Sequence, residues 1–264
     1  MGCGEYNFME DKMTTSTETV SNQEGRSLWF HLIGIIDRPI STFAAIAKRR
    51  KWTTWALPLA IVLITLTLMV VAQAPYTAEF AREQAAIQLA TLPEAQAEQA
   101  RSITEITTSV PFMIGMGLLF GYLAVIIGML IEAAFYYFGS IIMGGNDTNF
   151  GAVFTMNSWS RLPMAIGYLV QLGIILVTQS MITAPGLSYF VAGNDLMENA
   201  KNPVYVLLAN IDLFWLWHLV LAALGLAVVA RMNRGKSAVL VILYAILALG
   251  ISVGWAILSV SMAG

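Results

Sequence analysis

Four polar side chains inside long apolar stretches are the residues of this sequence best placed to do chemistry: Glu132, Gln171, Asp212 and His218. If those stretches cross a membrane, a carboxylate or an imidazole there can carry protons or bind an ion. Such groups are costly in lipid, about 2.5–3.5 kcal/mol for an acid at the centre of a span. Depth and neighbours therefore decide between a working site and a structural role.

Glu132 shares a helical stripe with glycines. Gly121, Gly128 and Gly139 lie 11, 4 and 7 residues from it, so that all four fall near one face of a helix. Glycines on one face permit close helix approach, so the stripe faces protein and Glu132 points inward, where a partner or water satisfies it. The aromatic run at 135–138 places an interface about one turn away and favours a structural role. The other glycines expected at helix contacts are Gly117, Gly250 and Gly254.

Asp212 and His218 belong to another apolar stretch. Counting back about 20 residues from Arg231, the length that crosses a hydrocarbon core, places Asp212 at the boundary beside Trp215 and Trp217, where an aromatic belt belongs. His218 lies deeper, and a lone histidine there more often hydrogen-bonds a neighbouring helix than carries protons. Six residues separate the two, which point to different faces and form no ready-made pair.

No catalytic or metal-binding set is visible in the sequence. Gln171 shares a face with Gly167 and Thr178, a polar lining too sparse for a conduction path. Zinc-type HExxH, nucleotide-binding glycine loops and a nucleophile elbow are all missing, and Cys3 alone forms neither an internal disulfide nor a thiolate cluster. The sequence predicts no catalytic residues, no metal and no cofactor.

The elements that carry these residues are membrane helices. Of 264 residues, 58% are hydrophobic and only 11% are charged, against about 25% in soluble domains. The apolar runs are continuous rather than alternating, which predicts an all-α polytopic membrane protein. A net charge of −2 gives no bulk attraction for nucleic acid.

Three regions are expected along the chain. Residues 1–25 form a disordered tail, residues 26–54 a surface amphipathic helix region, and residues 55–264 a bundle of five spans. The spans are expected at about 55–74, 110–143, 162–183, 204–230 and 237–262.

The basic residues predict an orientation, because cytoplasmic loops are enriched in Lys and Arg. Eleven of them fall on the side of the amino terminus and three on the other side, so the amino end is expected in the cytoplasm and the carboxyl end outside. The three are Arg82, Arg101 and Lys201, and the eleven include Arg161, counted as a loop residue.

The surface region turns at Pro39 and continues as a helix in which Ile40, Phe43, Ile46 and Ala47 share one face. Its basic end is expected to contact anionic lipid headgroups; an open alternative is a simple stop signal that fixes topology. The basic residues are Lys48, Arg49, Arg50 and Lys51.

The order of these features resembles the Yip family, the Ypt/Rab-interacting-protein domain family, in its bacterial form. The likeness is carried by Pro39 and Phe43, Phe150 and Phe154, Ser160 and Pro163, then Asp212, Phe214, Trp217, Gly225, Gly235 and Lys236. It implies a five-span protein of the bacterial cytoplasmic membrane and no active site. Eukaryotic members have a Gly-Pro-containing motif before the first span, whereas "IIDRPISTF" has no Gly before its Pro, which argues against GTPase binding.

Two hypotheses for function follow. The first is a non-enzymatic membrane protein that organises lipids or partner proteins, with membrane lipids, a membrane-protein partner or further copies of itself as partners. The alternative is a small transporter or permease subunit that uses Glu132 and His218. A membrane enzyme is a distant third, because no nucleophile and base can be placed together.

Overall fold

The computed structural model describes residues 28–49, 51–146 and 148–263, with side chains described from Phe30 through Leu258 within these ranges. Within these ranges the chain is helical and has no strand, which confirms the all-α class. The expected disordered tail at 1–25 and the lipid contact of Arg50 fall outside the described residues.

The helices vary widely in length. In chain order they are α2 (Leu28–Asp37), α3 (Pro39–Ala47), α4 (Thr53–Ala90), α5 (Glu94–Thr107), α6 (Val110–Ile142), α7 (Phe150–Ser160), α8 (Leu162–Thr178), the 3-10 turn η1 (Gly186–Phe190), α9 (Leu196–Lys201), α10 (Pro203–Ala209), α11 (Leu213–Val229) and α12 (Arg234–Ala263).

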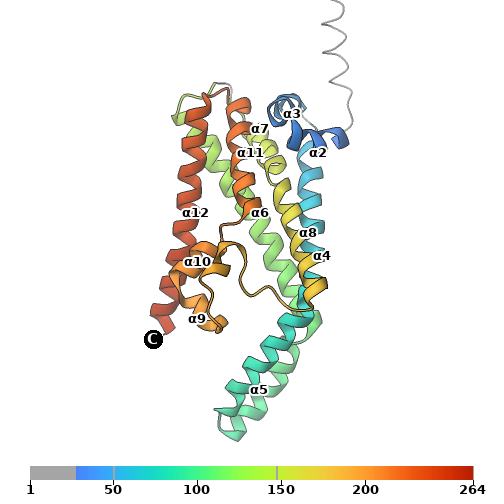
Figure 1. Cartoon of the computed structure of the whole chain (residues 1–264), viewed down its shortest axis with the longest axis vertical. Coiled ribbons are helices and arrows are strands. Elements are labelled where there is room, and N and C mark those ends of the chain that lie inside the picture. Colours follow the sequence, from blue (N-terminus) through green and yellow to red (C-terminus); the bar gives the residue numbers. More distant parts are fainter. Residues whose placement is uncertain (1–27, 50, 147, 264) are drawn as a thin grey trace, which may run out of the picture.

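The long helices run side by side along the longest axis of the molecule (Figure 1). Helix α4 packs on α6 and α8, and α11 packs on α7, α8 and α12. The α2–α3 pair covers one end, named here the α3 end. Helix α5 and the last turns of α4 project from the opposite end, the α5 end, where the chain also terminates (Figure 1).

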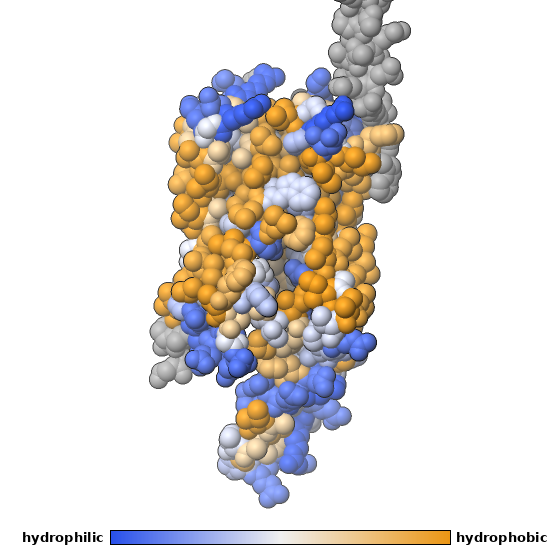
Figure 2. Space-filling view, in the orientation of Figure 1, coloured by the Kyte–Doolittle hydropathy of each residue, from blue (hydrophilic) through white to orange (hydrophobic). Residues whose placement is uncertain are grey.

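The bundle is built to cross a membrane. Four helices are long and apolar enough to span one, at 53–90, 110–142, 150–178 and 234–258, and α10 with α11 makes a fifth if that bent pair counts as one span. Figure 2 shows hydrophobic surface around the middle of the face in view and hydrophilic surface at its ends. The chain is therefore a polytopic helical membrane protein, as its composition predicts.

The third span differs from its expected bounds because it begins at Phe150 and is interrupted at Arg161. Pro163 stands in the first turn of α8 and has no N–H to continue the helix. The backbone tightens there, with the Met164 N–H donating to the Arg161 carbonyl at 2.9 Å. The Ser160 carbonyl, whose helical donor would be Met164, is thereby left to a partner from another helix.

The fourth span is broken rather than continuous, because α10 and α11 meet at an angle of 61°. Asp212 caps α11 by accepting from the Trp215 N–H at 2.7 Å, and so ends one helix direction and begins another. Gly186, with φ of +59°, lies where an added Cβ would come within 2.5 Å of the Ile211 carbonyl oxygen. Only a glycine lets η1 approach the break so closely.

The largest buried cluster lies where α2 and α3 meet the bundle. Phe43 of α3 and Met156 and Trp159 of α7 are fully buried there. An added Cβ on Gly225 of α11 would lie 2.6 Å from Met156 Cγ and 2.9 Å from Phe43 Cζ. This glycine therefore lets α3 and α7 contact α11, which fixes the position of His218 two turns away.

Phe43 and Ile46 face protein rather than lipid, since they are 0% and 2% exposed. Half of the apolar face expected for this helix is thus part of the core, whereas Ile40 and Ala47 are exposed. The exposed apolar row belongs to α2 instead, where Phe30, Ile33 and Ile36 are 64%, 71% and 54% exposed.

Candidate functional site

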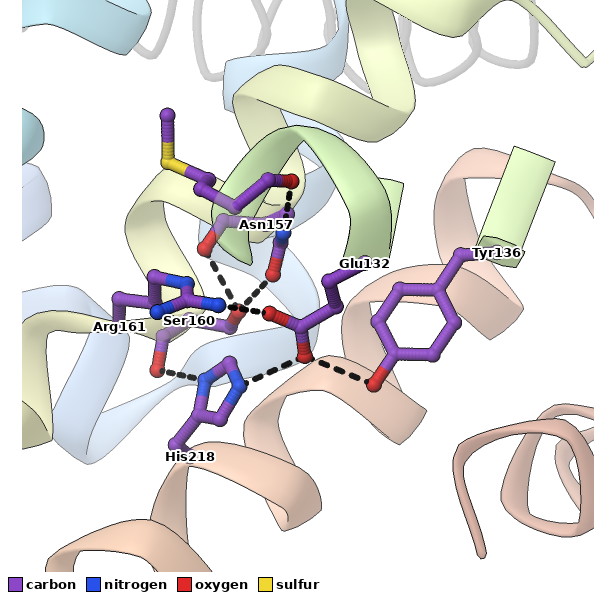
Figure 3. A network of polar contacts seen from close by, with 7 residues as sticks. Glu132, Tyr136, Asn157, Ser160, Arg161 and His218 are labelled. Atoms are coloured by element: carbon purple, nitrogen blue, oxygen red, sulfur yellow. Dashed lines mark hydrogen bonds and ion pairs between the residues drawn. The ribbon is translucent and has the colours of Figure 1, made fainter. Parts of the chain in front are cut away.

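A buried cluster of polar side chains joins three spans. Glu132 comes from α6, Ser160 and Arg161 come from the interruption between α7 and α8, and His218 comes from α11. Figure 3 shows the side chains of Arg161 and His218 converging on the Glu132 carboxylate, and the Ser160 carbonyl facing His218. Glu132 is 0% exposed and His218 is 3% exposed, so the cluster is closed to solvent.

The carboxylate of Glu132 is fully engaged. Its Oε2 accepts from Nη2 of Arg161 in an ion pair. Its Oε1 accepts from the Tyr136 hydroxyl at 2.9 Å and lies 2.8 Å from His218 Nε2 (Figure 3). Three donors from three segments thus compensate the cost of burying this acid.

His218 bridges the acid and the helix break. Its Nδ1 lies 3.0 Å from the Ser160 carbonyl oxygen, which can only accept, so Nδ1 carries a proton. Its Nε2 lies 2.8 Å from Oε1 of Glu132. His218 therefore links the Glu132 carboxylate of α6 to the break between α7 and α8.

The rest of α7 is tied to its neighbours by polar side chains. Asn157 donates to the Met129 carbonyl of α6 at 3.1 Å. Ser158 and the Trp159 indole donate to the carbonyls of Trp55 and Thr54 in α4, each at 2.7 Å. These bonds fix the rotation of α7, and so they aim Arg161 at Glu132.

Arg161 corrects the sequence interpretation, which counted it as a loop charge. Its side chain is 17% exposed and lies within the third span. Its Nε is buried without a hydrogen-bond partner. The sequence already carried a signal for this position, because Arg161 is the one charged residue between Phe150 and Thr178. Pro163 follows two residues later and has no N–H to continue the helical hydrogen bonds.

The other polar candidates lie apart from this cluster. Asp212 is half-buried and serves as the cap of α11, and no contact joins its side chain to His218 in the described structure. Gln171 is half-buried on α8. Tyr136, Asn157 and Ser160 are the cluster members that sequence reasoning missed, although Tyr136 stands one turn from Glu132.

The candidate packing glycines divide into two groups. An added Cβ would lie 2.9 Å from Val70 at Gly117, 3.3 Å from Leu66 at Gly121 and 2.4 Å from Leu240 at Gly139. These three lie at helix contacts. At Gly128, Gly250 and Gly254 an added Cβ would meet nothing within 4 Å, so the expected close approach is wrong there within the described chain.

The basic residues gather around a cavity at the α3 end. Lys48, Arg49 and Lys51 line it together with Arg231 from the turn after α11. Among the described residues no group of three or more His, Cys, Asp and Glu is placed to hold a metal.

The fold and the buried cluster define a multi-pass helical membrane protein with an ion pair inside the bundle. The family model described as the Yip1 domain matches residues 33–257, and the chain therefore belongs to the Yip family. The matched range includes α3, every span and all members of the cluster. No curated protein and no solved structure matches the chain.

Proposed function

We propose that this protein is a non-enzymatic organiser of the cytoplasmic membrane that gathers lipids and partner proteins at its α3 end. The observation that carries the proposal is the exposed apolar row of α2, Phe30, Ile33 and Ile36, beside the basic residues that follow α3. A helix that buries one face in protein and exposes an apolar row on another is stable where that row enters lipid or a partner.

The orientation belongs to the same proposal. The α3 end carries seven described basic residues, and the α5 end carries Arg82, Arg101 and Lys201. When Arg161 is counted with the bundle instead of the loops, the number of basic residues expected on the α3 side falls by one. That side still has more basic residues than the α5 side. This bias supports a cytoplasmic α3 end and a carboxyl end on the outside.

The buried cluster supports an organiser rather than a catalyst. Glu132 binds groups of its own chain, and its strongest partner, Arg161, is held in place by the hydrogen bonds of α7. Such a cluster holds α6, α7 and α11 in register and gives the α2–α3 pair a rigid support.

Photo-crosslinking in native membranes tests the organiser. A photo-reactive amino acid in place of Ile33 is expected to give adducts with protein or lipid that are enriched over those from a matched site at the α5 end. Ile103, 64% exposed, provides that control. Equal adduct patterns from the two sites would refute a specialised α3 end.

The transporter is a second candidate, favoured by one observation. The contact of His218 with Glu132 lies beside the interrupted third span, and His218 itself belongs to the broken fourth span. Discontinuous helices build substrate sites in transporters. It predicts a pH-dependent flux in proteoliposomes that Tyr136→Phe alters and that Glu83→Gln, an exposed control on α4, leaves unchanged. A wild-type protein that moves no protons or solute under a pH gradient eliminates it.

A further inference from the structure

A cavity lies between four segments at the α3 end. It has a volume of about 710 Å³, within the usual range of small-molecule sites. Its walls come from the end of α3, the start of α4, the first turns of α7 and the last turns of α11. The packing of Phe43, Met156 and Gly225 holds these segments together below it.

The described charged residues that line this cavity are all basic. Lys48, Arg49, Lys51 and Arg231 contribute to its lining, and no Asp or Glu is among the described residues that line it. Lys48 and Lys51 are exposed, so their ammonium groups can move to meet a ligand. Two exposed ammonium groups beside arginines from two separate segments favour an anion with several acceptor oxygens.

The rest of the lining is apolar and aromatic. Ile46, Val228 and Val229 form the floor with small residues of α3 and α7, and Trp55 forms part of the wall. Trp52, one turn before Trp55, is 69% exposed. Tryptophan is enriched at the level of lipid headgroups, so the cavity lies where charged headgroups meet the first carbons of the acyl chains.

We propose that this cavity binds one anionic phospholipid, with the phosphate between Lys48, Lys51 and the arginines and the glycerol end against Val228 and Val229. A lipid rather than a soluble phosphate fits, because a cavity for a soluble anion has no need of an apolar floor at the membrane boundary. This inference deepens the proposed function by naming the lipid class that the α3 end gathers, and it rests on that function's orientation.

Native mass spectrometry of the purified full chain in detergent tests the site. Phosphatidylglycerol is titrated against phosphatidylcholine, and wild type is expected to retain one molecule of phosphatidylglycerol in preference. Each lysine near an anionic headgroup contributes enough for about a five-fold change in affinity, so Lys48→Gln with Lys51→Gln is expected to weaken binding about thirty-fold. The control pair Arg82→Gln with Arg101→Gln, at the α5 end, is expected to leave binding unchanged.

A second variant separates a cavity from a diffuse basic surface. Ala44→Leu with Ala152→Leu keeps every charge and fills the hollow, since both alanines line it. Loss of the retained phosphatidylglycerol in this variant supports the cavity, whereas wild-type binding overturns it. Binding at the wild-type level by the double lysine variant also overturns the proposal. So does a finding that inorganic phosphate binds the lipid-free protein and prevents phosphatidylglycerol from binding.

The outcomes remain distinct from those for the proposed function. Crosslinking at Ile33 in native membranes reports what the α2 row contacts, and it succeeds with or without a bound lipid in the purified chain. A negative lipid titration with positive Ile33 adducts rejects the lipid site alone.

Discussion

Neutralising Glu132 is the sharpest perturbation of the buried cluster. The change Glu132→Gln keeps the shape of a side chain that is 0% exposed and removes the charge that pairs with Arg161. It also replaces one of the two carboxylate oxygens by an amide NH2, so Arg161 and His218 no longer each have an oxygen to contact. Removing one partner of a buried pair costs about 3–5 kcal/mol, because the other charge stays buried and uncompensated.

Thermal unfolding in detergent, followed by tryptophan fluorescence, measures this cost. For a chain of this size about 2–4 °C of Tm accompanies each kcal/mol, so the expected loss is about 6–20 °C. Glu83→Gln removes an exposed glutamate of α4 and is expected to change stability by no more than about 0.5 kcal/mol.

The sign of a second substitution tests the physical reason. Arg161→Met in the Glu132→Gln background removes the orphaned charge and is expected to raise Tm above that of Glu132→Gln alone. A wild-type Tm for Glu132→Gln would refute the buried pair. So would an Arg161→Met change that lowers the Tm of Glu132→Gln further, because the two effects would then be independent losses.

Three further outcomes are expected. Gly225→Val forces a Cβ to within 2.6 Å of α7 and is expected to destabilise by about 1–3 kcal/mol in the same unfolding assay, whereas Gly250→Val meets open space and is expected to change little. Trp159→Phe leaves a buried carbonyl of α4 without its donor, at a cost of about 1–3 kcal/mol that a lowered Tm reports. Single cysteines at Asn233 and Ser102, in a background without the native cysteine, are expected to react with a membrane-impermeant thiol reagent from opposite sides, Ser102 from outside intact cells; labelling of both from one side contradicts the orientation.

The Arg161–Glu132 pair gives a reason for burying two charged residues in a bundle that has so few. Helices in lipid gain little from apolar contact with one another, because lipid is as apolar as the side chains themselves. A buried ion pair with hydrogen-bonded neighbours has few alternative partners, so it specifies which face of α6 meets α7 and α11.

The sequence by itself determined the membrane class, the all-α fold, the family and the approximate ends of α6 and α12, because hydrophobic length and continuity are local properties of the chain. It also placed Glu132 on an inward face. It could not reveal that α10 and α11 are two helices, since the break depends on a cap at Asp212 and a close approach by Gly186 from another segment.

Only the tertiary structure decided what the polar groups do. Glu132 meets Arg161 across 29 residues and His218 across 86, and such contacts depend on the rotation and register of separate helices. The packing of separate helices also decides which glycines lie at a helix contact. Gly139 lies against Leu240, whereas Gly128 on the same helix meets open space. Helical periodicity defines a face, but the neighbour that the face meets is set by the packing of the whole bundle.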